Sequence, residues 1–285
     1  MALNPQDLPS DRQAQRLADL YRQAQQDIAR EIERAVLLGD DWKAQERRRQ
    51  LRAVVDAMAA LGRETDPEAR AVVAQAFSDG AALAAADVVR LGATTSPGME
   101  RAFNAVNREA VKAAEDALLG RLQSARRGVV TAANDVFRQR TRETALRALL
   151  GAEGSPQKAS RALRRRLVAD GQVAFTDRAG RRWKLADYAD MAIRTETRHA
   201  VVEGQVNRLA AHGIDLVRVS RHATACPVCQ PHEGKLIDLA GDTTVFLGEP
   251  VADGPLPPYH PRCRHTIGGV SRRAEEIRAE LLEAS

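Results

Sequence analysis

Two short segments decide how the C-terminal part of this chain is expected to fold: Cys226-Pro-Val-Cys229 and, thirty residues later, His260-Pro-Arg-Cys-Arg-His265. Together they hold all three cysteines of the 285-residue chain, and four of its six histidines lie between residues 222 and 265. Two thiols separated by two residues bind one metal ion from a tight backbone knuckle, and a second pair of ligands from far along the chain completes a tetrahedron. We therefore predict a structural zinc ion here.

Three of the four expected zinc ligands are the cysteines, Cys226, Cys229 and Cys263. The fourth is a histidine, and two candidates stay open. His260 is slightly favoured because the gap between His260 and Cys263 equals the gap within the first pair, whereas His265 follows Cys263 by two positions and would have to fold back. The nearby His222 and His232 are expected beside the ligands or on the surface.

Other interpretations of the cysteines are weaker. Reduced structural cysteines need no metal, and a redox pair of the thioredoxin type needs a long helix after the second cysteine, which the segment 230–234 does not start. A zinc deaminase needs its His-x-Glu before Pro-Cys-x-x-Cys, but here His232-Glu233 comes afterwards. A His-Asn-His nuclease needs an asparagine, and residues 210–285 contain none.

The composition of the chain excludes few functions, but it bears on nucleic-acid binding, membrane insertion and compartment. Lys and Arg number 43 against 38 Asp and Glu, which gives a net charge of +5, and all but five of the basic residues are arginine. Such an excess permits nucleic-acid binding without requiring it. We find no apolar run near the roughly 20 residues of a membrane span and no secretory signal at the N-terminus. We therefore expect no membrane partner, and unpaired cysteines favour a reducing, cytoplasmic place of synthesis.

The first half of the chain has the periodicity of long helices. We expect helix from about residue 11 to 61, broken at Gly39-Asp40-Asp41, and a new helix that starts at Thr65-Asp66-Pro67-Glu68, where proline occupies the first turn. A third helix is expected over about 99–150, with a candidate interruption near Gly128.

The second half changes character. Residues 173–176 and 181–184 flank Asp-Arg-Ala-Gly and predict a β-hairpin. An amphipathic helix is expected from about 185 to 212, closed by Gly213, with His199 on its apolar stripe. Three strands and a final charged helix are expected after it, over residues 216–220, 235–239, 266–270 and 271–283.

These elements predict a mainly α protein, with long N-terminal helices followed by a small α+β module stapled by zinc. A cluster of turn residues begins at Gly151, and a short basic helix follows it. We accordingly place the domain boundary there, with a helical arm or bundle over residues 1–160 and the zinc-binding module over residues 161–285.

Two sets of charged residues are further candidates. Arg194 and Glu196 lie two apart on the helix expected over 185–212, where they would clamp different neighbours unless this is simply an exposed face. The short basic helix offers candidate phosphate contacts, with a solvated face as the alternative. Its arginines are Arg161, Arg164, Arg165 and Arg166.

Several of these segments resemble one family. The run Asp177–Thr197 with its Arg-Thr-Glu, the run Gly213–His222, the segment Cys226–Lys235 and the ending His260–His265 resemble the minor capsid proteins of tailed phages, also called head morphogenesis or Mu-F-like proteins. The likeness covers about residues 171–270. Many relatives end Cys-Arg-Cys where this chain has Cys-Arg-His, so the fourth ligand remains open.

The resemblance implies a non-enzymatic protein of the virion, assembled in the host cytoplasm and located inside the capsid. Its implied partners are the portal protein and the major capsid or scaffold proteins, with double-stranded DNA bound without sequence preference. Two alternatives are kept: a zinc-dependent nucleic-acid-modifying enzyme or toxin-like domain, and a plain non-specific DNA-binding protein. An enzyme would need an open metal position and a base within reach.

Overall fold

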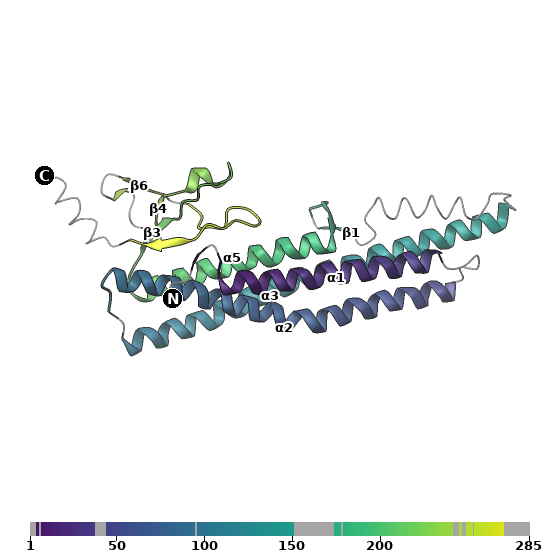
Figure 1. Ribbon diagram of the computed structural model, residues 1–285, viewed down its shortest axis with the longest axis horizontal. Coiled ribbons are helices and arrows are strands. Elements are labelled where there is room, and N and C mark those ends of the chain that lie inside the picture. Colours follow the sequence, from purple (N-terminus) through teal and green to yellow (C-terminus); the bar gives the residue numbers. More distant parts are fainter. Residues whose placement is uncertain are drawn as a thin grey trace, which may run out of the picture. The chain divides into compact units, whose positions relative to one another are not determined.

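The computed structural model confirms a mainly helical chain with a small sheet near its C-terminal end (Figure 1). The described residues are 4–5, 7–37, 44–94, 96–150, 174–177, 179–241, 245–246, 249–252 and 254–270. The predicted break at 39–41, the domain boundary near 160, the basic helix with Arg161, Arg164, Arg165 and Arg166, and the helix over 271–283 lie outside these residues.

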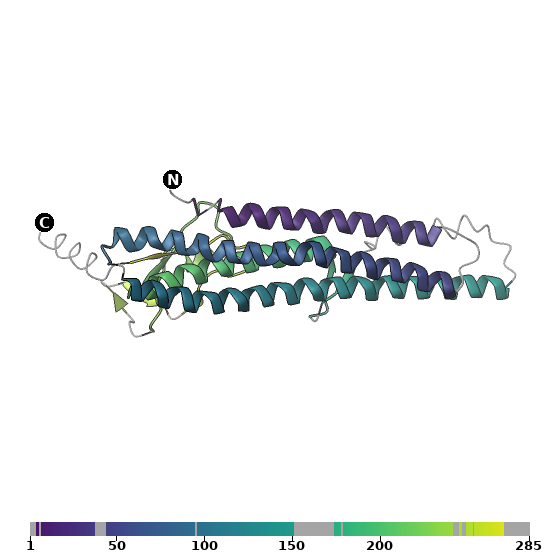
Figure 2. The same cartoon turned by 90° about the horizontal axis from the view of Figure 1, so that it is seen from below.

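Three long helices occupy the first half: α1 (Pro9–Leu37), α2 (Ala44–Arg90) and α3 (Pro97–Leu150). Figure 2 shows α2 and α3 as uninterrupted helices. The predicted helix start at Thr65-Asp66-Pro67-Glu68 was therefore wrong, because Pro67 lies inside α2. An interior proline normally breaks a helix, since it lacks an N–H and clashes with the preceding turn.

A buried polar network explains why α2 continues through Pro67. Arg126 of α3 donates to both carboxylate oxygens of Asp66, at 2.8 and 3.0 Å, and to the hydroxyl of Tyr21 at 2.8 Å. The Thr65 hydroxyl donates to the Leu61 carbonyl at 2.7 Å and lies 3.2 Å from the Tyr21 hydroxyl. The residues next to the proline are thus held by tertiary contacts, and these outweigh the local preference for a break.

Within the described residues, one helix is long and apolar enough by composition to cross a membrane, over Gln45–Arg90. Half of its apolar window is buried inside the fold. The core helix of a soluble protein meets the same two criteria, so this helix is weak evidence for a membrane span.

The predicted hairpin is confirmed. Strand β1 (Ala174–Thr176) pairs antiparallel with β2 (Arg182–Lys184), and Phe175 lies opposite Trp183. The Phe175 ring packs over Gly128 of α3, where a Cβ atom would lie only 2.7 Å from it. Gly128 therefore does not interrupt the helix but makes room for an aromatic ring.

Helix α5 (Leu185–Ala211) ends just before Gly213, as predicted, and the positive φ of 68° at this residue suits glycine. A five-stranded sheet in the order β5-β6-β4-β3-β7 follows it. Neighbours in this sheet pair antiparallel except β4 with β6, which are parallel. The strands are β3 (Leu216–Val219), β4 (Leu236–Asp238), β5 (Val245–Phe246), β6 (Glu249–Ala252) and β7 (Ile267–Gly269).

Two features of this half differ from the expectation. Strands β5 and β6 lie between the strands expected over 235–239 and 266–270, where no strand was expected. His199 is exposed rather than on the apolar face of α5. The apolar residues of α5 are buried as expected, among them Leu185, Ala192, Val202 and Leu209, and burial extends to the polar Thr195, Thr197 and Arg198, but it does not include His199.

The contacts divide the chain into two compact units, each assembled from separate stretches. Unit 1 comprises Met1–Ala14, Ala69–Leu118 and Met191–Ser285, and unit 2 comprises Gln15–Glu68 and Leu119–Asp190. The Arg126 network and the β-hairpin belong to unit 2, whereas the five-stranded sheet belongs to unit 1. In unit 1, one apolar cluster joins Ala84 and Val88 of α2, Val202 and Leu209 of α5, and Val217 of the sheet.

Helices α2 and α5 touch backbone to backbone in unit 1. A Cβ atom on Gly80 would lie 2.0 Å from the carbonyl oxygen of Val201, and one on Gly204 would lie 2.4 Å from the carbonyl oxygen of Phe77. Neither position has room for any side chain. The two glycines therefore set how closely these helices approach each other.

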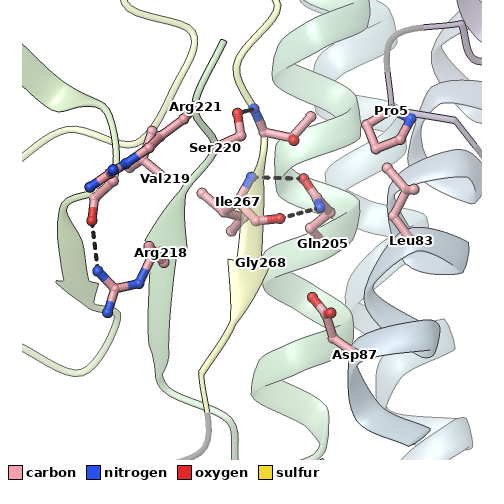
Figure 3. A pocket seen from close by; sticks show the side chains of 12 residues that line it. Pro5, Leu83, Asp87, Gln205, Arg218, Val219, Ser220, Arg221, Ile267 and Gly268 are labelled. Carbon is pink, nitrogen blue, oxygen red and sulfur yellow. Dashed lines mark hydrogen bonds between the residues drawn. The ribbon is translucent and has the colours of Figure 1, made fainter. Parts of the chain in front are cut away.

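Side chains from α2 and α5 cover the outer edge of β7. The Gln205 amide donates to the Ile267 carbonyl at 2.6 Å and accepts from the Ile267 N–H at 3.4 Å, as Figure 3 shows. Two residues along, the Gly269 N–H donates to Asp87 at 2.8 Å, and its carbonyl accepts from Arg90 at 2.8 Å. The edge thus pairs with side chains instead of another strand. A pocket of about 400 Å³ borders these contacts.

Candidate metal centre

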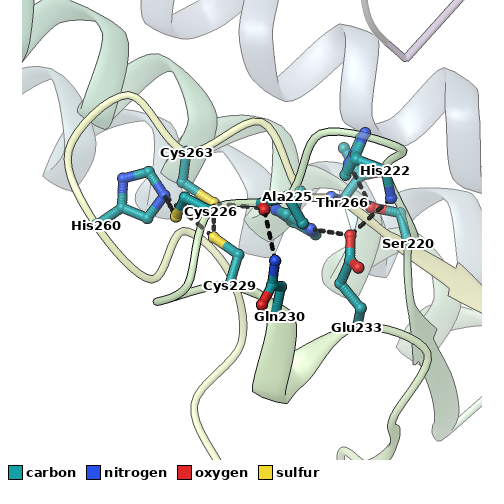
Figure 4. Close-up of polar contacts among 11 residues, drawn as sticks. Ser220, His222, Ala225, Cys226, Cys229, Gln230, Glu233, His260, Cys263 and Thr266 are labelled. Carbon is teal, nitrogen blue, oxygen red and sulfur yellow. Dashed lines mark hydrogen bonds and ion pairs between the residues drawn. The ribbon is translucent and has the colours of Figure 1, made fainter.

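The candidate ligands come from two loops that adjacent strands bring together. Cys226 and Cys229 lie in the loop after β3, in a turn whose Cys229 N–H donates to the Cys226 carbonyl at 2.9 Å. His260 and Cys263 form a matching turn before β7, with a 3.1 Å bond from the Cys263 N–H to the His260 carbonyl. Because β3 pairs with β7, the two turns lie next to each other (Figure 4).

Five donor atoms gather there, in two groups of three that share Cys229. One group is Cys226, Cys229 and His260, and the other is Cys229, Cys263 and His265; within each, the donor atoms lie within 4.8 Å of one another. All five predicted residues are thus brought together. Soft thiolates and imidazole nitrogens in this number form a donor set suited to zinc.

The two cysteines of the knuckle have different acidities. Hydrogen bonding from the backbone N–H of Cys229, more than any other influence, lowers the pKa of Cys226. Burial, and then the neighbouring Cys263 thiol, raises the pKa of Cys229 to about 12. Without a cation, Cys229 therefore stays protonated at neutral pH. A metal ion would displace this proton, because thiols bind metals as thiolates.

Tyr259 offers an independent test of whether a cation fits. Its hydroxyl is buried and has no hydrogen-bond partner among the described residues. Burial, and then Cys263 and Cys229, raises its pKa to about 12, so the hydroxyl lies in the field of both sulfurs. Buried hydroxyls nearly always have a partner. An orphaned polar atom beside a donor set of thiols and imidazoles is compatible with an ion at the centre.

Glu233 was not identified from the sequence, although it links the neighbouring histidines. Its carboxylate accepts from the His222 backbone N–H at 2.6 Å and lies 2.9 Å from the Nε2 atom of His265. The His265 contact, and then the His222 N–H, lowers the pKa of Glu233. The His222 ring packs edge-on against His265, with a centroid distance of 4.3 Å, and its Nε2 atom lies 3.0 Å from the Ser220 hydroxyl.

Comparison with protein families decides the class of the molecule. Residues 3–269 match the family described as phage minor capsid protein 2, so the match includes the long helices as well as the metal cluster. The chain belongs to this family. No curated protein and no solved structure matches the chain. As a phage minor capsid protein, it has a structural role in the phage head.

The other charged residues predicted for this minor capsid protein lie on α5. Glu196 is buried and Arg194 is half-buried, so the pair is not a simple exposed face. Their role as clamps stays a prediction. A neighbour that sequence reasoning missed is buried more deeply than Arg194: Arg198 donates to both carboxylate oxygens of Asp11, at 3.2 and 3.3 Å. Asp11 lies 187 positions away, so only the fold reveals the pair.

Proposed function

We propose that this minor capsid protein docks at the portal complex inside the phage head and contacts packaged DNA. The observation that carries the proposal is the family match over residues 3–269, because it includes the helices and the sheet together. A portal-bound component must keep its shape while the head assembles around it. Packing of bare backbone at Gly80 and Gly204, and side-chain pairing along β7, would supply that rigidity.

Zinc has a structural role in this proposal. Cys226 follows β3 and Cys263 precedes β7, so one ion bound to both would tie two adjacent strands together at one end. A small sheet of short strands gains much of its stability from such a cross-link, and structural zinc contributes on the order of 10 kcal/mol to folding in small domains. An enzymatic centre would instead keep a position open for water.

Contact with DNA is proposed through phosphates alone. All but five of the 43 basic residues are arginine, which binds phosphate with two parallel hydrogen bonds. Arg161, Arg164, Arg165 and Arg166 remain the proposed contacts. Binding without sequence preference should weaken steeply with salt, with a slope set by the number of phosphates neutralised. Fluorescence anisotropy with two unrelated DNA duplexes of equal length, measured over a salt series, tests both properties.

Two experiments decide the location. The chain is co-expressed with the cognate portal protein carrying an affinity tag, and purified virions are analysed by mass spectrometry. We expect co-purification that survives nuclease treatment, and a few copies of the chain in each virion. If the chain neither co-purifies with the portal protein nor occurs in virions, the proposal is overturned and the zinc-enzyme alternative is favoured. X-ray absorption at the zinc edge separates those roles, because four protein ligands indicate structure and three plus water indicate catalysis.

A further inference from the structure

The metal centre contains one donor more than a tetrahedral zinc ion can bind. Three cysteines leave a single position for an imidazole, yet both His260 and His265 direct a nitrogen at the sulfurs. The sequence pattern alone slightly favoured His260. Four kinds of observation bear on the choice: tautomer, distance, burial and anchoring.

Both imidazoles are in a tautomer that can bind metal. The Nδ1 atom of His260 lies 2.7 Å from the Pro261 carbonyl, which can only accept, so the proton is on Nδ1 and the lone pair is on Nε2. The Nε2 atom of His265 lies 2.9 Å from the Glu233 carboxylate, so its lone pair is on Nδ1. In each ring the bare nitrogen is the one that faces the sulfurs. Tautomer therefore does not distinguish them.

Distances do distinguish them. Bonds of about 2.3 Å to sulfur and about 2.05 Å to nitrogen place two sulfurs about 3.8 Å apart, and sulfur and nitrogen about 3.6 Å apart, around a tetrahedral zinc ion. Cys229 and Cys263 have sulfurs 3.7 Å apart, and the Nδ1 atom of His265 lies 3.5 Å from the Cys263 sulfur. The Nε2 atom of His260 lies closer, at 3.3 and 3.1 Å from Cys226 and Cys229, which suits a hydrogen bond with a thiol.

Burial and anchoring point the same way. His265 is 3% exposed, packs against the His222 ring, and is held by a carboxylate from another part of the fold. His260 is only half-buried, and its Nδ1 contact is to the next residue along the chain. A ligand that the fold already holds in place loses less conformational freedom on binding.

We infer that His265, binding through Nδ1 and oriented by Glu233, is the permanent imidazole ligand, and that His260 is a spare donor at the exposed side of the centre. This inference rests on the proposed zinc site. Zinc is held by Cys226, Cys229, Cys263 and His265, and Glu233 is a positioning residue.

The test measures zinc affinity by competition with a fluorescent chelator, for the wild type and for His265→Ala, His260→Ala and Glu233→Gln. His212→Ala, at the end of α5, is the matched control. We expect His265→Ala to lose at least about 100-fold in affinity and Glu233→Gln about 10-fold. His260→Ala and the control should stay within about threefold of the wild type, because neither removes a permanent ligand.

Because His265→Ala could also impair folding, a second measurement uses the unaltered protein. Long-range ¹H–¹⁵N correlation spectra of the zinc-loaded chain should show the metal-bound nitrogen shift at Nδ1 of His265 and an unbound Nε2 at His260. Metal-bound His260 with unbound His265, or an equal loss in the two alanine variants, overturns the inference. If the wild-type chain binds no zinc, the proposed zinc site itself is wrong. This outcome differs from the results that overturn only the choice of His265.

Discussion

Gly80 of α2 lies so close to Val201 of α5 that a single methyl group on the glycine would stand 2.0 Å from the Val201 carbonyl oxygen. The contact is backbone against backbone, so a side-chain rotation cannot relieve it. Gly204 makes the reciprocal contact with Phe77. The crossing of these two helices positions α5 against the apolar cluster that also contains residues of the sheet.

Gly80→Ala should therefore destabilise the protein although alanine favours helix. We expect a loss of about 2–4 kcal/mol in the free energy of unfolding, because the helices must separate or bend to admit the methyl group. Gly120→Ala in α3 is the matched control: that position has nothing within 4 Å, so the change should stabilise by about 0.5–1 kcal/mol. Urea unfolding followed by circular dichroism measures both. If Gly80→Ala and Gly120→Ala changed the free energy of unfolding equally, close packing at Gly80 would not be the cause.

Gln205→Ala should weaken the attachment of α5 to the sheet. The substitution leaves the buried N–H and carbonyl of Ile267 without partners, at an expected cost of about 1–3 kcal/mol. Hydrogen exchange at the Ile267 amide should become faster, by a factor that corresponds to a similar loss in free energy. Gln23→Ala removes an exposed amide whose hydrogen bonds, within the described part of the chain, are to Asp27, and should change stability by less than about 0.5 kcal/mol.

Removal of the Arg126 guanidinium should lower the free energy of unfolding of unit 2. Arg126→Met leaves Asp66 and the Tyr21 hydroxyl without their cation, and we expect a loss of about 3–5 kcal/mol in a denaturant titration. The double variant Arg126→Met with Asp66→Asn should recover part of the loss, because no unpaired charge then remains. If the double variant is less stable than Arg126→Met, the ion pair is not the source of the cost.

The raised pKa of Tyr21 predicts that the folded protein loses stability in alkali. Burial raises the pKa of its hydroxyl, with Arg126 acting in the opposite direction. A group with a raised pKa in the folded state contributes stability that is complete below its unfolded pKa, near pH 10, and is lost as pH rises through the folded value. The free energy of unfolding of the wild type should fall faster above about pH 10 than that of Tyr21→Phe. If the free energies of unfolding of the two proteins fall equally with pH, Tyr21 is not the cause of the loss in alkali.

Zinc removal should affect the sheet far more than the long helices. A chelator, or Cys263→Ser, should lower the melting temperature of the sheet and expose its apolar residues, while the helical signal of unit 2 persists. Zinc content by mass spectrometry should fall in parallel from about one ion per chain. Freshly purified, reduced protein that contains no zinc would remove the basis for this expectation.

The sequence predicted those elements whose signals are local. The hairpin follows from turn residues around Gly180, and α5 follows from apolar periodicity and the glycine that ends it. The cysteine cluster follows from spacing alone, since two knuckles with ligand-type side chains rarely occur by chance. In each case the decisive residues are neighbours along the chain.

Prediction failed where distant residues decide the outcome. Nothing near Pro67 indicates that Arg126, some 60 positions later, holds the helix together around it. Glu233 is an ordinary acidic residue until the fold places it against His265. Gln205 and Gly80 have no motif, because their roles depend on how closely a strand edge and a second helix approach.

Unit 1 has a consequence for synthesis on the ribosome. Its three stretches begin at Met1, Ala69 and Met191, and its apolar cluster needs Ala84, Leu209 and Ile267 at once. The first of these residues leaves the ribosome long before the last, so the core of unit 1 can close only after residue 267 has emerged. A chain whose translation stops early would expose the apolar face of α2 and would be a target for proteases.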